Sequence, residues 1–141
     1  SPDREGLLSR IWPRELTRLP QGRGDLGARM ARTISRTPGP TLLIGSDIPG
    51  VSRNDIWDAF RLLARAPSVI GPAPDGGYWL VGLRHPDHAP SGLFKNVRWS
   101  TQHTLADTLP TLPQPVCRAA IKQDVDTAID LVEWRRNRDV T

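Results

Sequence analysis

The sequence predicts an α/β domain with a doubly wound, mostly parallel sheet, and three observations support this class. Apolar runs of strand length alternate along the chain with amphipathic stretches of helix length. Polar, glycine-containing motifs follow the apolar runs directly, as ligand-binding loops do in such sheets. The 141 residues suffice for one core. We therefore expect a single domain over residues 1–141.

The clearest strand signal is Thr41–Ile44, an apolar run that predicts a strand covered on both faces. Asp47 follows within the motif Gly-Ser-Asp-Ile-Pro and is expected just beyond the carboxyl end of that strand. A carboxylate there could hold a hard cation against substrate phosphates. It could equally open a turn or cap the next helix. The motif alone leaves both interpretations open.

Two amphipathic helices carry N-terminal signals. The first is predicted over about 25–36, with Asp25 as its N-cap. The second begins after Ser52, and Asp55 at its third position predicts a capping box. The stripes expected to face the core are Leu26, Met30 and Ile34 in the first helix and Ile56, Phe60 and Leu63 in the second.

Other elements follow from periodicity and turn residues. Further strands are predicted at 15–19, 68–70, 78–83 and 116–121, and further helices at 3–11, 101–109 and 128–138. Trp57, Trp79 and Trp134 fall in regular elements and are expected in the core, whereas Trp99 on a loop could line a pocket.

Composition limits the classes of function. Net charge is +4, but the basic residues are dispersed, which argues against a nucleic-acid partner. No apolar run approaches the length of a membrane span. The single cysteine, Cys117, cannot form an internal disulfide and is expected to be a buried structural thiol. These features together predict a cytoplasmic protein.

Three acidic motifs follow three predicted strands: Asp47, Asp75 in Asp-Gly-Gly, and Asp124 with Asp126. Carboxylates gathered at one sheet edge repel each other unless a cation neutralises them. Oxygen ligands favour Mg²⁺ or Mn²⁺ over Zn²⁺, and the three histidines lack zinc spacing and are expected at the surface. The glycines after Asp75 would let a ligand approach the main chain, but they also suit a turn between two strands.

Five motifs stand in order between residues 21 and 131. They are Gln21-Gly22-x-Gly24-Asp25-Leu26-Gly27-x-Arg29-Met30, Gly45-Ser46-Asp47-Ile48-Pro49, Gly71-Pro72-Ala73-x-Asp75-Gly76-Gly77-Tyr78, Trp99-Ser100-Thr101 and Asp124-Val125-Asp126-Thr127-x-x-Asp130-Leu131. Together they resemble the bacterial DUF2064 family of glycosyltransferase-A-type proteins. The resemblance implies the fold of nucleotide-diphospho-sugar transferases and a metal-dependent transferase that acts on a nucleotide-activated sugar donor.

The resemblance also implies roles for single residues. Asp47 and Asp126 would hold Mg²⁺ or Mn²⁺ on the nucleotide phosphates, with Asp124 as a further metal candidate. Asp75 is the catalytic candidate, which would position an acceptor hydroxyl or act as a base. The substrate-binding candidates, for a nucleotide sugar or nucleotide, are Gly24, Asp25, Ser46, Gly76, Gly77 and Trp99.

The chain also departs from the family pattern. Members normally begin with a strand and a glycine- and lysine-containing loop that cradles the nucleotide, and nothing like it precedes Gln21. We therefore expect an N-terminally truncated fold, in which Thr41–Ile44 lacks its usual neighbouring strand. Three kinds of segment could take the place of the missing strand: one from a second copy in a homo-oligomer, rearranged local segments, or a complementing N-terminal segment.

Two other functions stay open at this point. One is a nucleotidyltransferase related to molybdenum-cofactor or phospholactate guanylyltransferases, which would use the same metal geometry. The other is a truncated, non-catalytic binding domain that keeps the family core.

Overall fold

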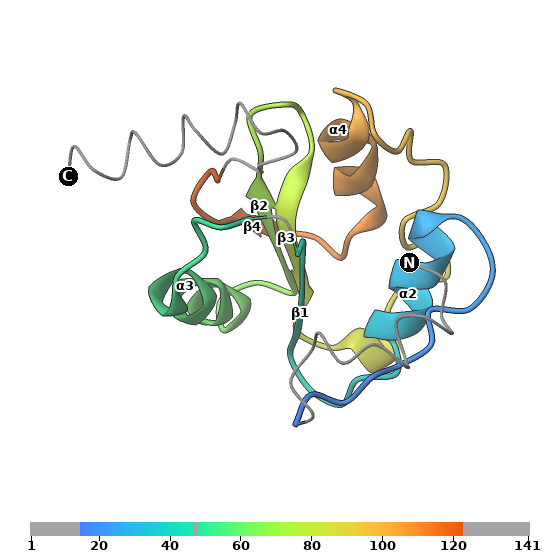
Figure 1. Cartoon of the computed structure of the whole chain (residues 1–141), viewed down its shortest axis with the longest axis horizontal. Helices are drawn as coiled ribbons and strands as arrows, with labels where there is room; N and C mark the ends of the chain where they lie inside the picture. The colour runs from blue at the N-terminus through green and yellow to red at the C-terminus, as the bar shows by residue number, and fades with distance from the viewer. Residues whose placement is uncertain (1–14, 47, 123–141) are drawn as a thin grey trace.

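The computed structural model describes residues 15–46 and 48–122 and has three layers (Figure 1). A four-stranded sheet lies between α3 on one face and α2 with α4 on the other. The elements in chain order are α2 (Leu26–Ile34), β1 (Thr41–Ile44), α3 (Arg53–Leu63), β2 (Ser68–Pro72), β3 (Tyr78–Leu83), η1 (Pro86–His88), α4 (Thr104–Thr108), η2 (Leu109–Thr111) and β4 (Val116–Arg118). The predicted α/β class is confirmed.

The sheet has the order β1-β3-β2-β4, and its strand directions correct the expectation of a mostly parallel sheet. Both β1 and β2 pair antiparallel with β3, and only β2 and β4 pair in parallel. The physical reason is the short link between β2 and β3, since residues 73–77 can form a hairpin but cannot span a crossover. Because β3 alone is reversed, β1, β2 and β4 run in one direction and end at the same edge of the sheet.

Strand β1 has the predicted bounds and lies at one edge of the described sheet. The Gly45 N–H donates to the Trp79 carbonyl at 3.0 Å, so alternate residues of β1 bond to β3. By this alternation, the N–H and C=O groups of Leu42 and Ile44 point away from β3. Ile44 is 41% exposed, so the expectation of two covered faces holds only in part. That a further strand fills this edge stays a prediction.

The helix caps agree with the sequence, whereas the buried face of α3 does not. The Asp25 carboxylate accepts from the Ala28 N–H at 2.8 Å and caps α2. The capping box of α3 forms as predicted between Ser52 and Asp55. The residues of α3 that face the sheet are Ala59 and Leu63. Phe60 and Trp57 are 37% and 64% exposed, so their assignment to the core was wrong.

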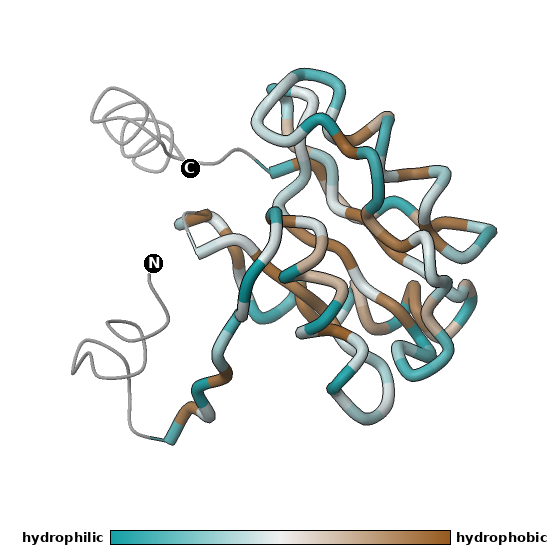
Figure 2. The backbone as a smooth tube through the Cα atoms, turned by 90° about the vertical axis from the view of Figure 1, so that its right-hand side faces the viewer, coloured by the Kyte–Doolittle hydropathy of each residue, from teal (hydrophilic) through white to brown (hydrophobic). Residues whose placement is uncertain are grey.

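Two apolar clusters form the core, one on each face of the sheet, and the hydrophobic stretches of the chain run through the strands (Figure 2). The cluster under α2 contains Ile34, Ile70, Val81, Leu83, Leu93, Phe94 and Leu112. The cluster under α3 contains Ile48, Ala59, Leu63, Val69, Trp79 and Leu80. Trp79 is buried as expected, and its indole N–H donates to the Ala120 carbonyl at 2.9 Å. Cys117 is partly buried beside the second cluster.

Several predicted elements differ or cannot be compared. No strand forms at 15–19, α4 is shorter than the predicted helix at 101–109, and β4 ends three residues before 121. The helices expected at 3–11 and 128–138, together with Trp134, lie outside the described residues. Within residues 15–46 and 48–122, no helix is long and apolar enough to cross a bilayer.

Candidate functional site

The candidate site lies at the end of the sheet where β1, β2 and β4 have their carboxyl ends. This end is called the site edge below and is distinct from the edge strand β1. Ser46 follows β1 at this edge and is exposed, the loop 73–77 follows β2, and residues 119–122 follow β4. Asp47, Asp124 and Asp126 lie outside the described residues. The described residues before and after Asp47, and those before Asp124, lie at this edge.

Asp75 stabilises the hairpin turn that carries it. Its side chain accepts from the Gly77 N–H at 2.8 Å, and the Gly77 carbonyl accepts from the Ala73 N–H at 3.0 Å. Gly76 between them has φ of +87°, a conformation that favours glycine. The turn interpretation of Asp-Gly-Gly is therefore confirmed. Asp75 is nevertheless exposed at the site edge, where it can meet a ligand.

Gly76 joins this turn to the loop that contains Trp99-Ser100-Thr101. Its carbonyl accepts from the Leu105 N–H at 2.9 Å. A Cβ added at Gly76 would lie 2.7 Å from the carbonyl carbon of Gln102 and closer still to the oxygen. Two motifs that are distant in sequence therefore pack backbone against backbone at this edge.

Trp99 packs inward instead of lining an open pocket. Its ring lies edge-on to Phe94, with centroids 6.4 Å apart, and also approaches Gly27 so closely that a Cβ there would lie 3.0 Å from the ring. The buried indole N–H has no hydrogen-bond partner among the described residues. The expectation that Trp99 binds substrate gains no support here, and its visible role is to hold α2 against the loop.

The glycine motif before α2 folds onto the helix. Gly24 is exposed with φ of +109°, and the Asp25 carboxylate is engaged in the helix cap. Arg32 donates to the carbonyls of Gln21 and Arg23, which closes the loop over the first turn. These contacts account for the motif structurally, and an anion-binding role for it stays a prediction.

An arginine–carboxylate pair fixes the loop after Trp99. Arg98 donates through Nε and Nη2 to the two carboxylate oxygens of Asp107 at 2.8 and 2.9 Å, and its backbone N–H adds a third bond at 3.1 Å. These hydrogen bonds lower the pKa of Asp107 to about 2. The sequence analysis missed this pair, because Arg98 lies in an irregular loop and Asp107 lies nine positions later in α4.

Lys122 joins three elements at the site edge. Its backbone N–H donates to the Pro72 carbonyl at 3.1 Å, and its ammonium group donates to the Gly50 carbonyl at 3.1 Å. The ammonium also lies 2.8 Å from the Asp55 carboxylate. Burial by itself raises the pKa of Asp55, but the hydrogen bonds from Lys122 and Ser52 outweigh it, so this pKa is lowered. Sequence reasoning missed Lys122, whose only signal is a cation placed just before an acidic motif.

Tyr78, which follows the Asp-Gly-Gly turn, provides a pH-dependent test of the packing. Burial raises its pKa to about 12, and the neighbouring Thr108 hydroxyl offsets part of the rise. The folded state therefore holds the phenol proton at pH values where the unfolded chain has lost it. We expect the free energy of unfolding to fall by about 2 to 3 kcal/mol between pH 10 and 12 through this group.

The measurement is simple because the chain has one tyrosine. Absorbance of phenolate at 295 nm should rise with a midpoint near pH 12 in the folded protein and near 10 in urea. The Tyr78→Phe variant should show no such rise. A folded-state midpoint near pH 10 would contradict the burial of this phenol.

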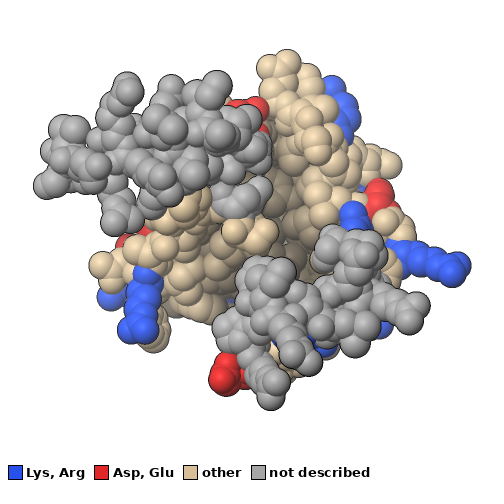
Figure 3. All heavy atoms as spheres, viewed as in Figure 1, with Lys and Arg blue, Asp and Glu red and all other residues tan. Residues whose placement is uncertain are grey.

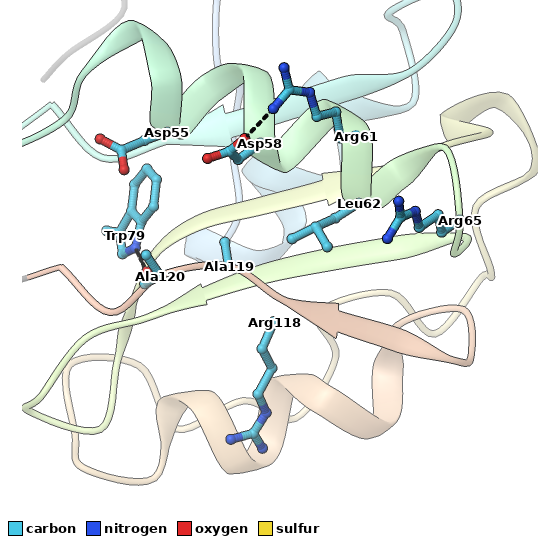
Figure 4. A pocket seen from close by; sticks show the side chains of 9 residues that line it. All are labelled: Asp55, Asp58, Arg61, Leu62, Arg65, Trp79, Arg118, Ala119 and Ala120. Atoms are coloured by element: carbon cyan, nitrogen blue, oxygen red, sulfur yellow. Dashed lines mark hydrogen bonds and ion pairs between the residues drawn. The ribbon is translucent and has the colours of Figure 1, made fainter.

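A groove of about 280 Å³ lies between α3 and β4, beside this edge, because Asp55, Ala119 and Ala120 help to line it (Figure 4). Its charged side chains are Asp55, Asp58, Arg61, Arg65 and Arg118. The three guanidinium groups point in different directions, and one of them pairs with Asp58 at 2.9 Å. Lysines and arginines are likewise scattered around the face seen in Figure 3. Neither arrangement offers a convergent anion site.

The kinds of donor atom near the site edge bear on which metal ion it would hold. Within the described residues, no three side chains of the His, Cys, Asp or Glu type gather closely enough to hold an ion. The three histidines are exposed, as predicted. The donors that the sequence brings to the site edge are oxygens, which fits Mg²⁺ or Mn²⁺ better than Zn²⁺.

One solved structure supports the fold assignment. A protein from Desulfovibrio desulfuricans G20, provisionally described as a nucleotide-diphospho-sugar transferase, is 33% identical with a TM-score of 0.68. The similarity covers 83% of this chain and 54% of that protein, so the chain spans about half the length of this relative. No curated protein matches the chain significantly.

A family model covers four of the five sequence motifs, those between residues 21 and 101. The model described as "Uncharacterized protein conserved in bacteria (DUF2064)" matches residues 1–101, which is more than half of the chain. The fold similarity to a nucleotide-diphospho-sugar transferase is consistent with this match. The chain therefore belongs to the DUF2064 family.

Proposed function

We propose that this chain is a metal-dependent transferase that acts on a nucleotide-activated sugar donor. The observation that carries the proposal is the common direction of β1, β2 and β4, which brings the flanks of all three acidic motifs to one edge. In α/β sheets, ligands bind at such carboxyl ends. The similarity to a protein provisionally described as a nucleotide-diphospho-sugar transferase supports the same assignment.

Within this proposal, Asp47 and Asp126 hold Mg²⁺ or Mn²⁺, with Asp124 as a further ligand candidate. The cation would neutralise the diphosphate of the leaving group when bound. Asp75, exposed on its turn, is placed to orient an acceptor hydroxyl, and Ser46 with the main chain of Gly76 and Gly77 would contact the donor.

The test is a thermal-shift titration of the full chain with Mn²⁺ and Mg²⁺, each with and without a panel of nucleotides and nucleotide sugars. Ligand at a hundredfold excess over Kd stabilises the folded state by about 2.7 kcal/mol. We therefore expect a cation-dependent rise in Tm with one nucleotide family, abolished by EDTA. A flat response from a folded sample would overturn the proposal.

Two alternative functions are distinguished by their products. A nucleotidyltransferase would use the same carboxylates but attack the α-phosphate, so it would release pyrophosphate, whereas sugar transfer releases a nucleoside diphosphate. A non-catalytic binding domain would release neither product. Cation-dependent nucleotide binding without either product would support that second alternative.

A further inference from the structure

We propose that Lys122 is a positioning residue that fixes the loop after β1 against the end of β4, and so sets the distance between the described residues that follow Asp47 and those that precede Asp124. This inference rests on the proposed function for its role at the site. The contact of the Lys122 ammonium group with Gly50 and Asp55, called the tie below, is seen among the described residues and can be tested separately.

The main chain around Lys122 is anchored to β2 beyond the end of β4. Ala119 donates to the Ile70 carbonyl at 2.9 Å, and Lys122 donates to the Pro72 carbonyl at 3.1 Å. The Trp79 indole N–H holds the Ala120 carbonyl between these two bonds. The ammonium group therefore extends from a backbone that the sheet already holds in place.

The ammonium group then reaches two other elements. It donates to the Gly50 carbonyl in the loop after β1 and pairs with Asp55 in the first turn of α3. The Lys122 and Asp55 side chains are 23% and 15% exposed, so this pair is largely shielded from water. Shielding strengthens a charge pair and makes the loss of one partner costly.

The Asp55 carboxylate is held in position by hydrogen bonds from Ser52. The oxygen that faces Lys122 also accepts from the Ser52 N–H at 2.8 Å and the Ser52 hydroxyl at 2.7 Å. The capping box therefore fixes the carboxylate, and the carboxylate fixes the ammonium over Gly50. Without the ammonium, the Gly50 carbonyl loses this donor and the loop loses its tie to residues 119–122.

A second ion pair on α3, the helix that carries Asp55, offers a matched control. Arg61 and Asp58 form an ion pair at 2.9 Å, with side chains 77% and 63% exposed. Exposed pairs of this kind contribute little to stability. Arg61→Met removes one positive charge, as Lys122→Met does, but takes away neither the contact of Lys122 with Asp55 nor its contact with Gly50. Both substitutions replace a long cationic side chain with an apolar one of similar reach.

The first readout needs no ligand. Hydrogen exchange at the Val51 amide, which donates to the Ile48 carbonyl within the loop, reports on the loop after β1. We expect Lys122→Met to speed this exchange tenfold or more in a protein that stays folded, and Arg61→Met to leave it unchanged. Unchanged exchange in Lys122→Met would overturn the tie, whatever the protein binds.

The second readout is the affinity for Mn²⁺ with the nucleotide that stabilises the wild-type chain, measured by calorimetry below the Tm of every variant. We expect Lys122→Met to weaken binding at least tenfold, Lys122→Arg to restore most of it, and Arg61→Met to bind as wild type. Faster exchange with unchanged affinity would overturn the positioning role. A wild-type chain that binds no nucleotide would instead overturn the proposed function, and exchange would still decide whether Lys122 holds the loop.

Discussion

Gly76→Ala should lower the free energy of unfolding by about 3 kcal/mol or more, because two independent costs meet at this position. The backbone has φ of +87°, where a side chain is strained. The new Cβ would also lie 2.7 Å from backbone atoms of Gln102, which cannot move without shifting the loop. The hydrogen bond from Leu105 to the Gly76 carbonyl would be strained by any such shift.

Gly39→Ala separates the two costs. Gly39 has a similar φ of +73°, but a Cβ there would meet no atom within 4 Å. We expect this control to lose about 1 kcal/mol, the cost of the backbone conformation alone. Urea denaturation followed by circular dichroism gives both values. If the two variants lose equal stability, the turn of Asp75-Gly76-Gly77 does not pack against Gln102 as described.

The local elements could be predicted from the sequence because short-range signals determine them. Strand β3 and the start of β2 have their predicted bounds, and Asp25 and Ser52 cap their helices as expected. Caps and strand ends depend on residues within three or four positions of each other. Correct prediction of helix caps and strand ends therefore says little about how the elements pack.

Strand direction was missed because continuous apolar runs are typical of parallel strands covered on both faces, whereas β3 is covered on both faces and yet pairs antiparallel. The decisive feature was the five-residue link between β2 and β3, which is too short for a crossover. The alternation of strand-like and helix-like segments led towards a mostly parallel sheet, whereas link length alone would have predicted this hairpin.

The buried face of α3 was predicted only in part. Leu63 is buried as predicted, whereas Phe60, which periodicity placed inward, and Trp57, which was expected in the core, are exposed, and the sheet contacts Ala59 instead. Two neighbouring helix faces were both apolar enough to be the core face. Only packing on the sheet chooses between them.

The candidate site was likewise predictable in its local features but not in its long-range contacts. The sequence predicted which motifs follow which strands, and the described residues next to those motifs lie at one edge. The contacts that hold this edge together were not predictable, since Lys122 reaches Gly50 across 72 positions and Gly76 meets Gln102 beyond β3 and the loop that follows it. Long-range contacts of this kind depend on the complete packing of the chain.

Asp47→Asn should weaken cation-dependent nucleotide binding at least about 100-fold, since even partners that only orient a metal ligand contribute about 10- to 100-fold. Asparagine keeps the size of aspartate and can still open a turn or cap a helix, but it lacks the negative charge that a hard cation requires. The substitution therefore separates the two interpretations that the motif left open. If the carboxylate holds the cation, binding is lost while the Tm of the unliganded protein stays near that of the wild type.

Asp58→Asn is the matched control for this prediction, since it removes one carboxylate from an exposed position on α3 that belongs to none of the three acidic motifs. Its affinity for Mn²⁺ and nucleotide, measured by calorimetry, should equal that of the wild type. Equal affinity in Asp47→Asn as well would leave Asp47 only the turn or cap role, and would move the search for ligands to Asp124 and Asp126. A loss of binding in Asp47→Asn alone would mean that its charge, and not its shape, is what the site uses.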